Sequence, residues 1–107
     1  MPRQNERRGR AAAMEIRYYI ESDSGLPHIY SHGVREDEVE EVLERPGEDR
    51  PGRERSRVAI GQTRVGRYLR VIYVPDADGS GIFVITAFDL RGKPLAAYRR
   101  RMKRRPR

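Results

Sequence analysis

The chain has 107 residues, of which 36% are apolar and another 36% charged, and its net charge at pH 7 is +7. This length suits one domain, because two separate cores would each be too small to be stable. Cysteine is absent, and no apolar run approaches the ~20 residues of a membrane span, which excludes disulfides, thiolate metal sites and membrane-spanning helices. We expect a cytoplasmic protein without a metal or cofactor.

The first segment, residues 1–13, has no hydrophobic period and contains four arginines and one glutamate. It also lacks the apolar stretch of a secretory signal. We interpret it as a disordered basic arm in front of a single domain over residues 14–105, with Met14 as an alternative start.

A strand and a helix are predicted next. Residues from Glu15 to Ile20 alternate in type and are rich in β-formers, which predicts a strand. Turn residues follow, and the segment from about Arg35 to Arg45 predicts a helix that Pro46 ends. Its apolar residues fall on one face, at helical spacing: Val39, Val42 and Leu43.

Three strands are predicted after a loop over residues 46–55: Ser56 to Gln62, Arg67 to Val74, and Ile82 to Phe88. Short polar connections between them indicate an antiparallel meander. The middle strand has apolar residues on both faces, which is typical of a central strand. Alternation places Arg67, Leu69, Val71 and Tyr73 on one face and Tyr68, Arg70, Ile72 and Val74 on the other.

The last predicted element is a helix that opens near Pro94. Its apolar face carries Leu95, Tyr98 and Met102, and cations cover the rest: Arg99, Arg100, Arg101, Lys103, Arg104 and Arg105. The predicted order is therefore β-α-β-β-β-α, an α+β fold with a small antiparallel sheet flanked by helices.

The charge is divided unevenly along the chain. Residues 91–107 contain nine Lys or Arg and no acid, whereas residues 14–90 contain ten basic and fifteen acidic residues. Clustered arginine indicates a polyanionic partner such as RNA, whose binding would depend strongly on salt. The alternatives are a solvated basic tail and a surface for an acidic protein.

Two stretches resemble BrnT-like toxins. Ser31-His32-Gly33-Val34 before an acidic helix is similar to the family's Lys/His-Gly-Val opening, and Gly61 to Tyr73 is similar to its G-x-T-x-x-G-R-x-L-x-V-x-Y hairpin. Val84 to Ala87, with Tyr98 in a basic helix, resembles its closing strand and helix. The resemblance implies a RelE-like fold, a metal-independent endoribonuclease acting on mRNA, free or on the ribosome, and a small antitoxin partner encoded nearby.

The chain departs from that family at three positions. Phe88 stands where the closing strand usually has arginine, and Pro94 stands four residues before Tyr98, where the helix usually has glutamate. Arg35 replaces the polar residue that usually caps the first helix.

RNA cleavage through the 2′-hydroxyl needs a base, an acid and cations for the crowded phosphate. His32 is the candidate acid/base, and Arg67 and Arg70 are candidate phosphate stabilisers. Tyr73 and Tyr98 complete the predicted catalytic set, because aromatic rings can stack on bases. The predicted RNA-binding residues are Arg99, Arg100, Arg101, Lys103 and Arg104.

Each of these residues also has a structural interpretation. His32 could hold the turn before the helix, Arg67 could form a salt bridge to Asp89 or to a helix glutamate, and the tyrosines could belong to the core. For the protein as a whole, the alternatives to a toxin are a non-catalytic RNA- or ribosome-binding module on the same fold and a protein-interaction domain.

Overall fold

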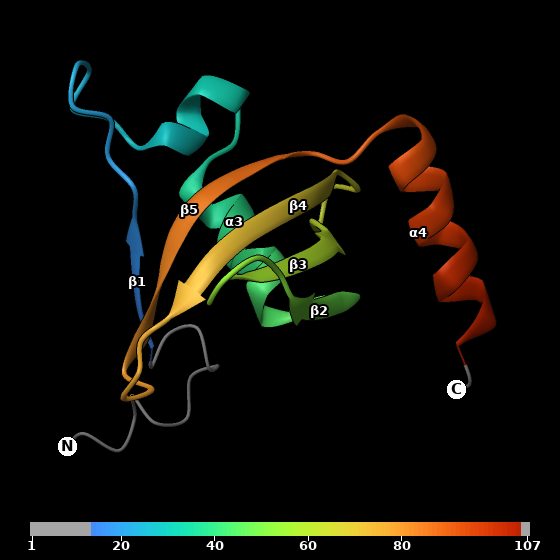
Figure 1. The fold of residues 1–107 in the computed structure, drawn as a ribbon. Helices are drawn as coiled ribbons and strands as arrows, with labels where there is room; N and C mark the ends of the chain where they lie inside the picture. The colour runs from blue at the N-terminus through green and yellow to red at the C-terminus, as the bar shows by residue number, and fades with distance from the viewer. Residues whose placement is uncertain (1–13, 106–107) are drawn as a thin grey trace, which may run out of the picture.

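Five strands form one mixed sheet in the computed structural model, which describes residues 14–105 (Figure 1). The predicted arm over residues 1–13 lies outside this range. The strands lie in the order β1-β5-β4-β3-β2 across the sheet. Their bounds are β1 Glu15–Tyr18, β2 Glu48–Pro51, β3 Arg57–Gln62, β4 Tyr68–Pro75 and β5 Gly81–Asp89.

The sheet differs from the prediction at both of its edges. The predicted all-antiparallel sheet is wrong at one edge, where β1 pairs parallel to β5, with Ile16 opposite Ile82. At the other edge, β2 lies inside the predicted loop over residues 46–55 and pairs antiparallel to β3. Its sequence, Glu-Asp-Arg-Pro, has little β propensity, so the pairing with β3 rather than local preference forms this strand.

Within residues 14–105, three helical segments accompany the sheet: the 3-10 helix η1 His28–His32, α3 Glu36–Glu44 and α4 Gly92–Arg104. The predicted helices correspond to α3 and α4. The Glu38 carboxylate accepts a hydrogen bond from the Arg35 backbone N–H at 3.0 Å and so caps the start of α3. No helix within the described residues is long and apolar enough to cross a membrane.

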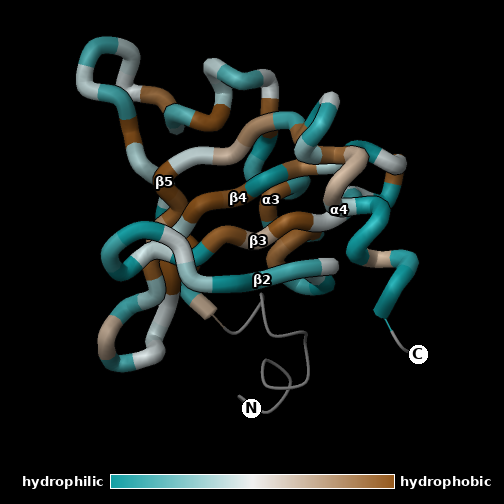
Figure 2. Tube along the Cα trace, turned by 45° about the vertical axis from the view of Figure 1, so that its right-hand side comes forward, coloured by the Kyte–Doolittle hydropathy of each residue, from teal (hydrophilic) through white to brown (hydrophobic). Residues whose placement is uncertain are grey.

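The main core fills the space between α3 and one face of the sheet, which we call the closed face. Val39 and Val42 from α3 pack there with Leu69 and Val71 from β4 and Val84 from β5, all fully buried. In Figure 2 the hydrophobic stretches gather chiefly in β3, β4 and α3. The predicted helical stripe and the predicted apolar face of the central strand therefore meet in this core.

Among the described residues, α4 covers one end of the opposite face of the sheet, which we call the open face. There α4 packs Leu95, Tyr98 and Met102 against Tyr68, Ile60 and their neighbours. This is the apolar face that the sequence predicts for the C-terminal helix. In Figure 1, α3 lies behind the sheet, α4 lies to the right, and the open face points toward the viewer.

Candidate functional site

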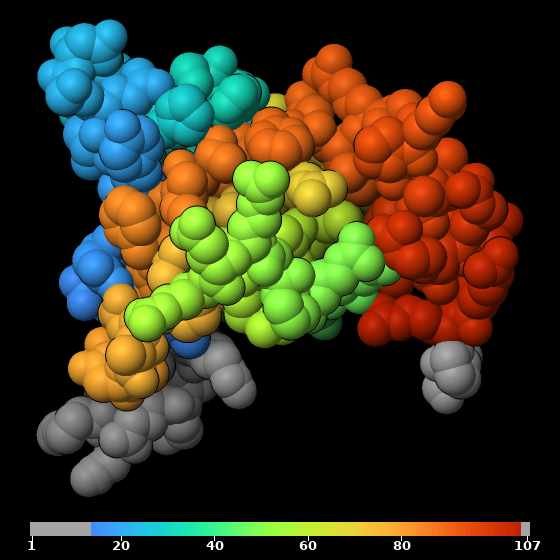
Figure 3. Space-filling model, viewed as in Figure 1, coloured from blue at the N-terminus to red at the C-terminus, as the bar shows by residue number. Residues whose placement is uncertain are grey.

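The open face brings together side chains from three strands. The register pairs Arg70 of β4 with Ile60 of β3 and Phe88 of β5, and it pairs Ile72 with Val58 and Thr86. Residues paired across strands share a face, so Arg70 lies near the middle of this surface. Figure 3 looks onto the same face, beside the projecting β2–β3 segment. Arg70 is a predicted site residue, and the surface around it has two unlike halves.

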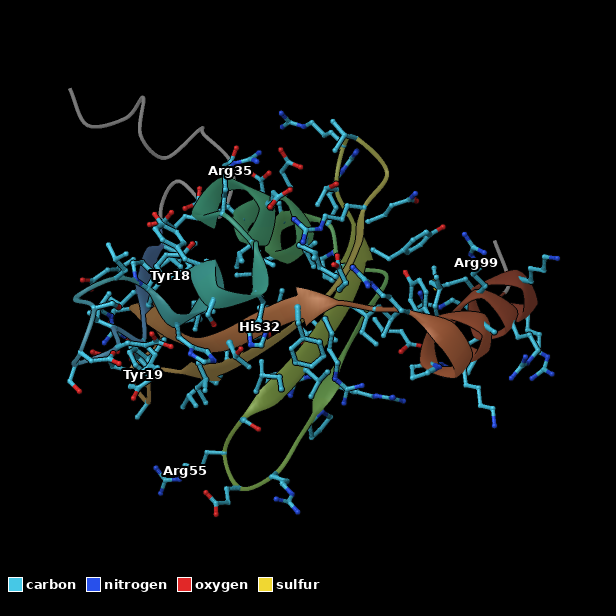
Figure 4. The ribbon with its side chains drawn as sticks, turned by 90° about the horizontal axis from the view of Figure 1, so that it is seen from above. Tyr18, Tyr19, His32, Arg35, Arg55 and Arg99 are labelled. Atoms are coloured by element: carbon cyan, nitrogen blue, oxygen red, sulfur yellow. The ribbon has the colours of Figure 1, made fainter. Side chains whose placement is uncertain are left out.

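The first half, which we call the aliphatic half, lies under the β2–β3 connection. It forms a pocket of about 880 Å³ whose apolar lining comes from Val58, Ile72, Val74 and Ile85. Arginines from β2, the connection and β4 also line it: Arg50, Arg53, Arg55 and Arg70. Figure 4 shows Arg55 on the side of the sheet away from Arg35 and α3.

The second half, which we call the aromatic half, lies toward η1 and α4. The ring of His32, the last residue of η1, lies 5.8 Å from the ring of Phe88. At the α4 end, the Tyr68 ring lies 6.1 Å from the Tyr98 ring, and the Arg99 guanidinium carbon lies 5.0 Å from the Tyr68 centroid. Aromatic rings beside arginines are the groups on which nucleic-acid bases stack.

His32 is linked to a second histidine through its ring. The His28 ring lies 5.1 Å from the His32 ring in an edge-on arrangement, and His28 Nδ1 lies 2.6 Å from a Glu21 carboxylate oxygen. A carboxylate at this distance orients the His28 imidazole. Figure 4 shows His32 beside β5. Its exposed ring is accessible to a ligand, whereas His28 is half-buried.

Arg67 lies on the closed face, away from Arg70. Its Nε donates to Asp89 at 2.7 Å, and its Nη1 donates to Glu38 at 2.9 Å and to the Gly33 carbonyl at 2.9 Å. The hydrogen bonds from Arg67 hold the pKa of Asp89 below its usual value. The guanidinium thereby ties α3, η1 and the end of β5 together, which is the structural interpretation that the sequence left open.

The two tyrosines of the predicted catalytic set are both buried. The Tyr73 hydroxyl, on the closed face, donates to Asp49 at 2.5 Å, and burial raises the pKa of Tyr73 to about 12. Tyr98 is 5% exposed and packs against Tyr68 under α4. The fold therefore brings only Arg70 and His32 of that set toward the open face, with Phe88 between them.

The cations of α4 divide into anchoring and exposed groups. Arg101 forms a two-point ion pair with Glu48 of β2, with one N–O distance of 2.9 Å, and Arg105 donates to the Gly47 carbonyl. The pair holds the pKa of Glu48 below its usual value. The remaining predicted RNA-binding residues are exposed: Arg99, Arg100, Lys103 and Arg104. Of the predicted set, Arg101 is thus the one that anchors the helix.

Sequence reasoning missed the arginines of the β2–β3 connection. Two Pro-Gly breaks predict a loop there, and the structure closes it as a hairpin in which the Gly52 N–H donates to the Ser56 carbonyl at 2.8 Å. The available signal was three arginines within six residues: Arg50 in β2, and Arg53 and Arg55 in the connection. Phe88 was noted only as a departure from a motif, yet it contacts His32.

Within residues 14–105, no three His, Asp or Glu side chains are grouped closely enough to hold a metal ion. No protein-family model, curated protein or solved structure matches the chain.

Proposed function

We propose that the protein binds RNA across the open face of its sheet and cleaves it without a metal ion, as a toxin of the RelE/BrnT-like type. The observation that carries this proposal is the position of Arg70. Its side chain lies on the open face beside Phe88, and it is in no salt bridge within the described part of the chain. A guanidinium with no acidic partner is available to a phosphate.

Each residue has a role in this proposal. Arg70 binds the scissile phosphate and stabilises its developing charge, while Phe88 stacks on a neighbouring base. His32 takes the proton of the 2′-hydroxyl. The 2′ oxygen then bonds to phosphorus and the bond to the 5′ oxygen breaks, so the products are a 2′,3′-cyclic phosphate and a 5′-hydroxyl after that oxygen gains a proton. The exposed cations of α4 hold the flanking phosphates.

Three residues of the predicted catalytic set have no catalytic role in this proposal: Arg67, Tyr73 and Tyr98. Their polar groups are buried or occupied by partners of this chain, so we assign them to positioning and stability. Tyr98 holds α4 against the sheet and thereby sets the position of Arg99 beside Tyr68.

A non-catalytic RNA- or ribosome-binding module is the second candidate. Cleavage needs both a base and an acid, and His32 is the one acid–base candidate that we assign to this surface. The lack of a second assigned group favours a module that binds RNA without cleaving it. In either case the proposed setting is the cytoplasm, and in the first case the cell also needs a small antitoxin that covers the RNA surface.

The test is cleavage of single-stranded RNA by the purified protein in buffer containing EDTA. We expect a 2′,3′-cyclic phosphate product from the wild type, and loss of at least ~100-fold in rate for His32→Ala, the scale of one acid–base group. Arg70→Ala should weaken binding and reduce the salt slope of log Kd by about one. Arg64→Ala, at an exposed arginine in the β3–β4 turn, is the matched control.

The outcomes separate the two candidates. Binding that depends on Arg70 but produces no cleavage, with or without ribosomes, would favour the non-catalytic module. Binding that Arg70→Ala and Arg64→Ala change equally would contradict both. Induced expression in cells offers a further check. Growth arrest would support the toxin if His32→Ala abolishes it and if co-expression of a small protein encoded by a neighbouring gene relieves it.

A further inference from the structure

The aliphatic half of the open face carries apolar surface that phosphate binding does not require. Ile85 is 36% exposed, and Ile72 and Val74 are partly exposed beside it. The pocket that they line with Val58 measures about 880 Å³, which is the size of a ligand site rather than a packing defect. Exposed aliphatic surface in a concave site indicates a partner that covers it.

The charge around this pocket is mainly positive. Arg50, Arg53, Arg55 and Arg70 line it, and Glu54 is the single acid among the lining residues. None of the four arginines is in a salt bridge within residues 14–105. Their neighbour Arg57 shows the contrast, because it pairs with Asp49 at 2.9 Å on the closed face.

We propose that the aliphatic half docks an acidic peptide segment of a partner protein, with aliphatic side chains on the floor and carboxylates against the four arginines. Complementary charge around an apolar centre is the pattern of a specific protein interface. An amphipathic segment in a groove meets both demands at once. The pocket shares Arg70 with the proposed RNA surface. The peptide proposal rests on the aliphatic lining and on Arg50, Arg53 and Arg55, so it does not depend on RNA binding.

The chemistry of the lining favours a peptide over RNA. None of the residues that line this pocket is aromatic, whereas the aromatic half contains Tyr68, Phe88 and His32. Bases of single-stranded RNA are bound by stacking on aromatic rings or arginine planes, and branched aliphatic side chains offer them no flat surface. Valine and isoleucine instead match the leucine, isoleucine and valine side chains of a peptide.

The experiment selects displayed random peptides against the complete chain and then measures the affinity of one recovered peptide by fluorescence anisotropy. We expect recovered peptides to have net negative charge and aliphatic residues at regular spacing. Ile85→Asp should reduce the affinity for the recovered peptide by at least ~10-fold, the effect of losing one well-packed apolar contact. Arg53→Glu combined with Arg55→Glu should also weaken it, with reduced salt dependence.

Matched controls come from the β3–β4 turn, outside the pocket. Val65 is 85% exposed, so Val65→Asp and Arg64→Glu should leave peptide affinity unchanged. Thermal melting of every variant shows that the fold persists.

Three results would overturn the proposal: recovered peptides without an acidic bias, affinity insensitive to Ile85→Asp, or equal loss with Val65→Asp. A parallel titration with an oligo-U strand tests the other occupant. If Ile85→Asp reduces the affinity for oligo-U and the selection enriches no peptide, RNA occupies the aliphatic half and the peptide proposal is wrong.

Discussion

The closed and open faces of the sheet use arginine in opposite ways. On the closed face, Arg67 donates to Glu38, Asp89 and a backbone carbonyl, and Arg57 pairs with Asp49. On the open face, Arg70 lines a pocket and is in no salt bridge among the residues that the structure describes. Residue type and place in the sequence do not distinguish Arg67 from Arg70, whereas the acidic partners of Arg67 do.

The largest expected loss of stability comes from removing the Arg67 ion pairs on the closed face. Arg67→Met removes the cation 2.9 Å from Glu38, whose side chain is 7% exposed, and leaves only Arg35 at 4.0 Å, so it should lower the free energy of unfolding by roughly 3 kcal/mol. Arg70→Met should change it by less than about 0.5 kcal/mol, because no buried partner is left behind. Urea denaturation of both variants measures the difference. Equal losses would remove the distinction between the two faces.

The next effect tests how α4 closes one end of the open face. A Cβ on Gly47 would lie 1.8 Å from the Tyr98 hydroxyl oxygen, so Gly47→Ala should cost about 1–3 kcal/mol of stability through overpacking. Adding Tyr98→Phe removes that oxygen and should restore part of the loss. A double-mutant cycle from chemical denaturation measures this coupling. Additive effects would show that Gly47 and Tyr98 do not contact each other in solution.

A smaller effect depends on pH and belongs to the closed face. Burial and the bond to Asp49 raise the pKa of Tyr73 to about 12, from about 10 in an unfolded chain. The stabilisation is therefore complete below pH ~10 and is lost as the pH rises toward about 12. Tyr73→Phe should cost about 1 kcal/mol at pH 7 and progressively less above pH ~10.

Urea unfolding at several pH values measures that narrowing difference. Tyr19→Phe is the control, since this ring is 47% exposed. A gap between wild type and Tyr73→Phe that stays constant up to pH ~12 would contradict the assignment of Tyr73 to a buried hydrogen bond.

The smallest expected loss of stability comes from Arg99→Ala, which tests whether α4 contributes to the proposed RNA surface. Arg99→Ala removes the cation above the Tyr68 ring and should lower stability by no more than about 1 kcal/mol. The same change should weaken RNA binding and lower its salt slope by about one. Filter binding over a salt series measures the slope, with Arg64→Ala as the reference. An unchanged slope would remove Arg99 from the RNA surface.

Much of the fold follows from local patterns. The stripe of α3, the two faces of β4 and the apolar face of α4 can all be predicted from residue spacing. The β1–β5 pairing cannot, because the parallel partner of each β1 residue lies 66 positions away and leaves no local signal. Strand β2 was missed for the related reason that Glu48–Pro51 becomes a strand only through β3.

The candidate site was harder to predict than the fold. Alternation separated Arg67 from Arg70, but only the tertiary contacts of Glu38 and Asp89 show which arginine is occupied. Tyr73 and Tyr98 match a motif, yet motif spacing carries no information on burial. The hairpin arginines lie in a segment whose composition predicts a loop, so their gathering above the sheet depends on the β2–β3 pairing.

The register shift between β4 and β5 places one residue of β5, Ile85, outside the core and in the lining of the pocket. Tyr73 pairs with Val84 and Ile72 with Thr86, so Ile85 is an extra residue without a partner across the strand. Its neighbours Val84 and Ala87 keep their places in the core, while Ile85 lines the pocket. A substitution at Ile85 would therefore change the surface of the proposed peptide site while leaving the packing of Val84 and Ala87 in place.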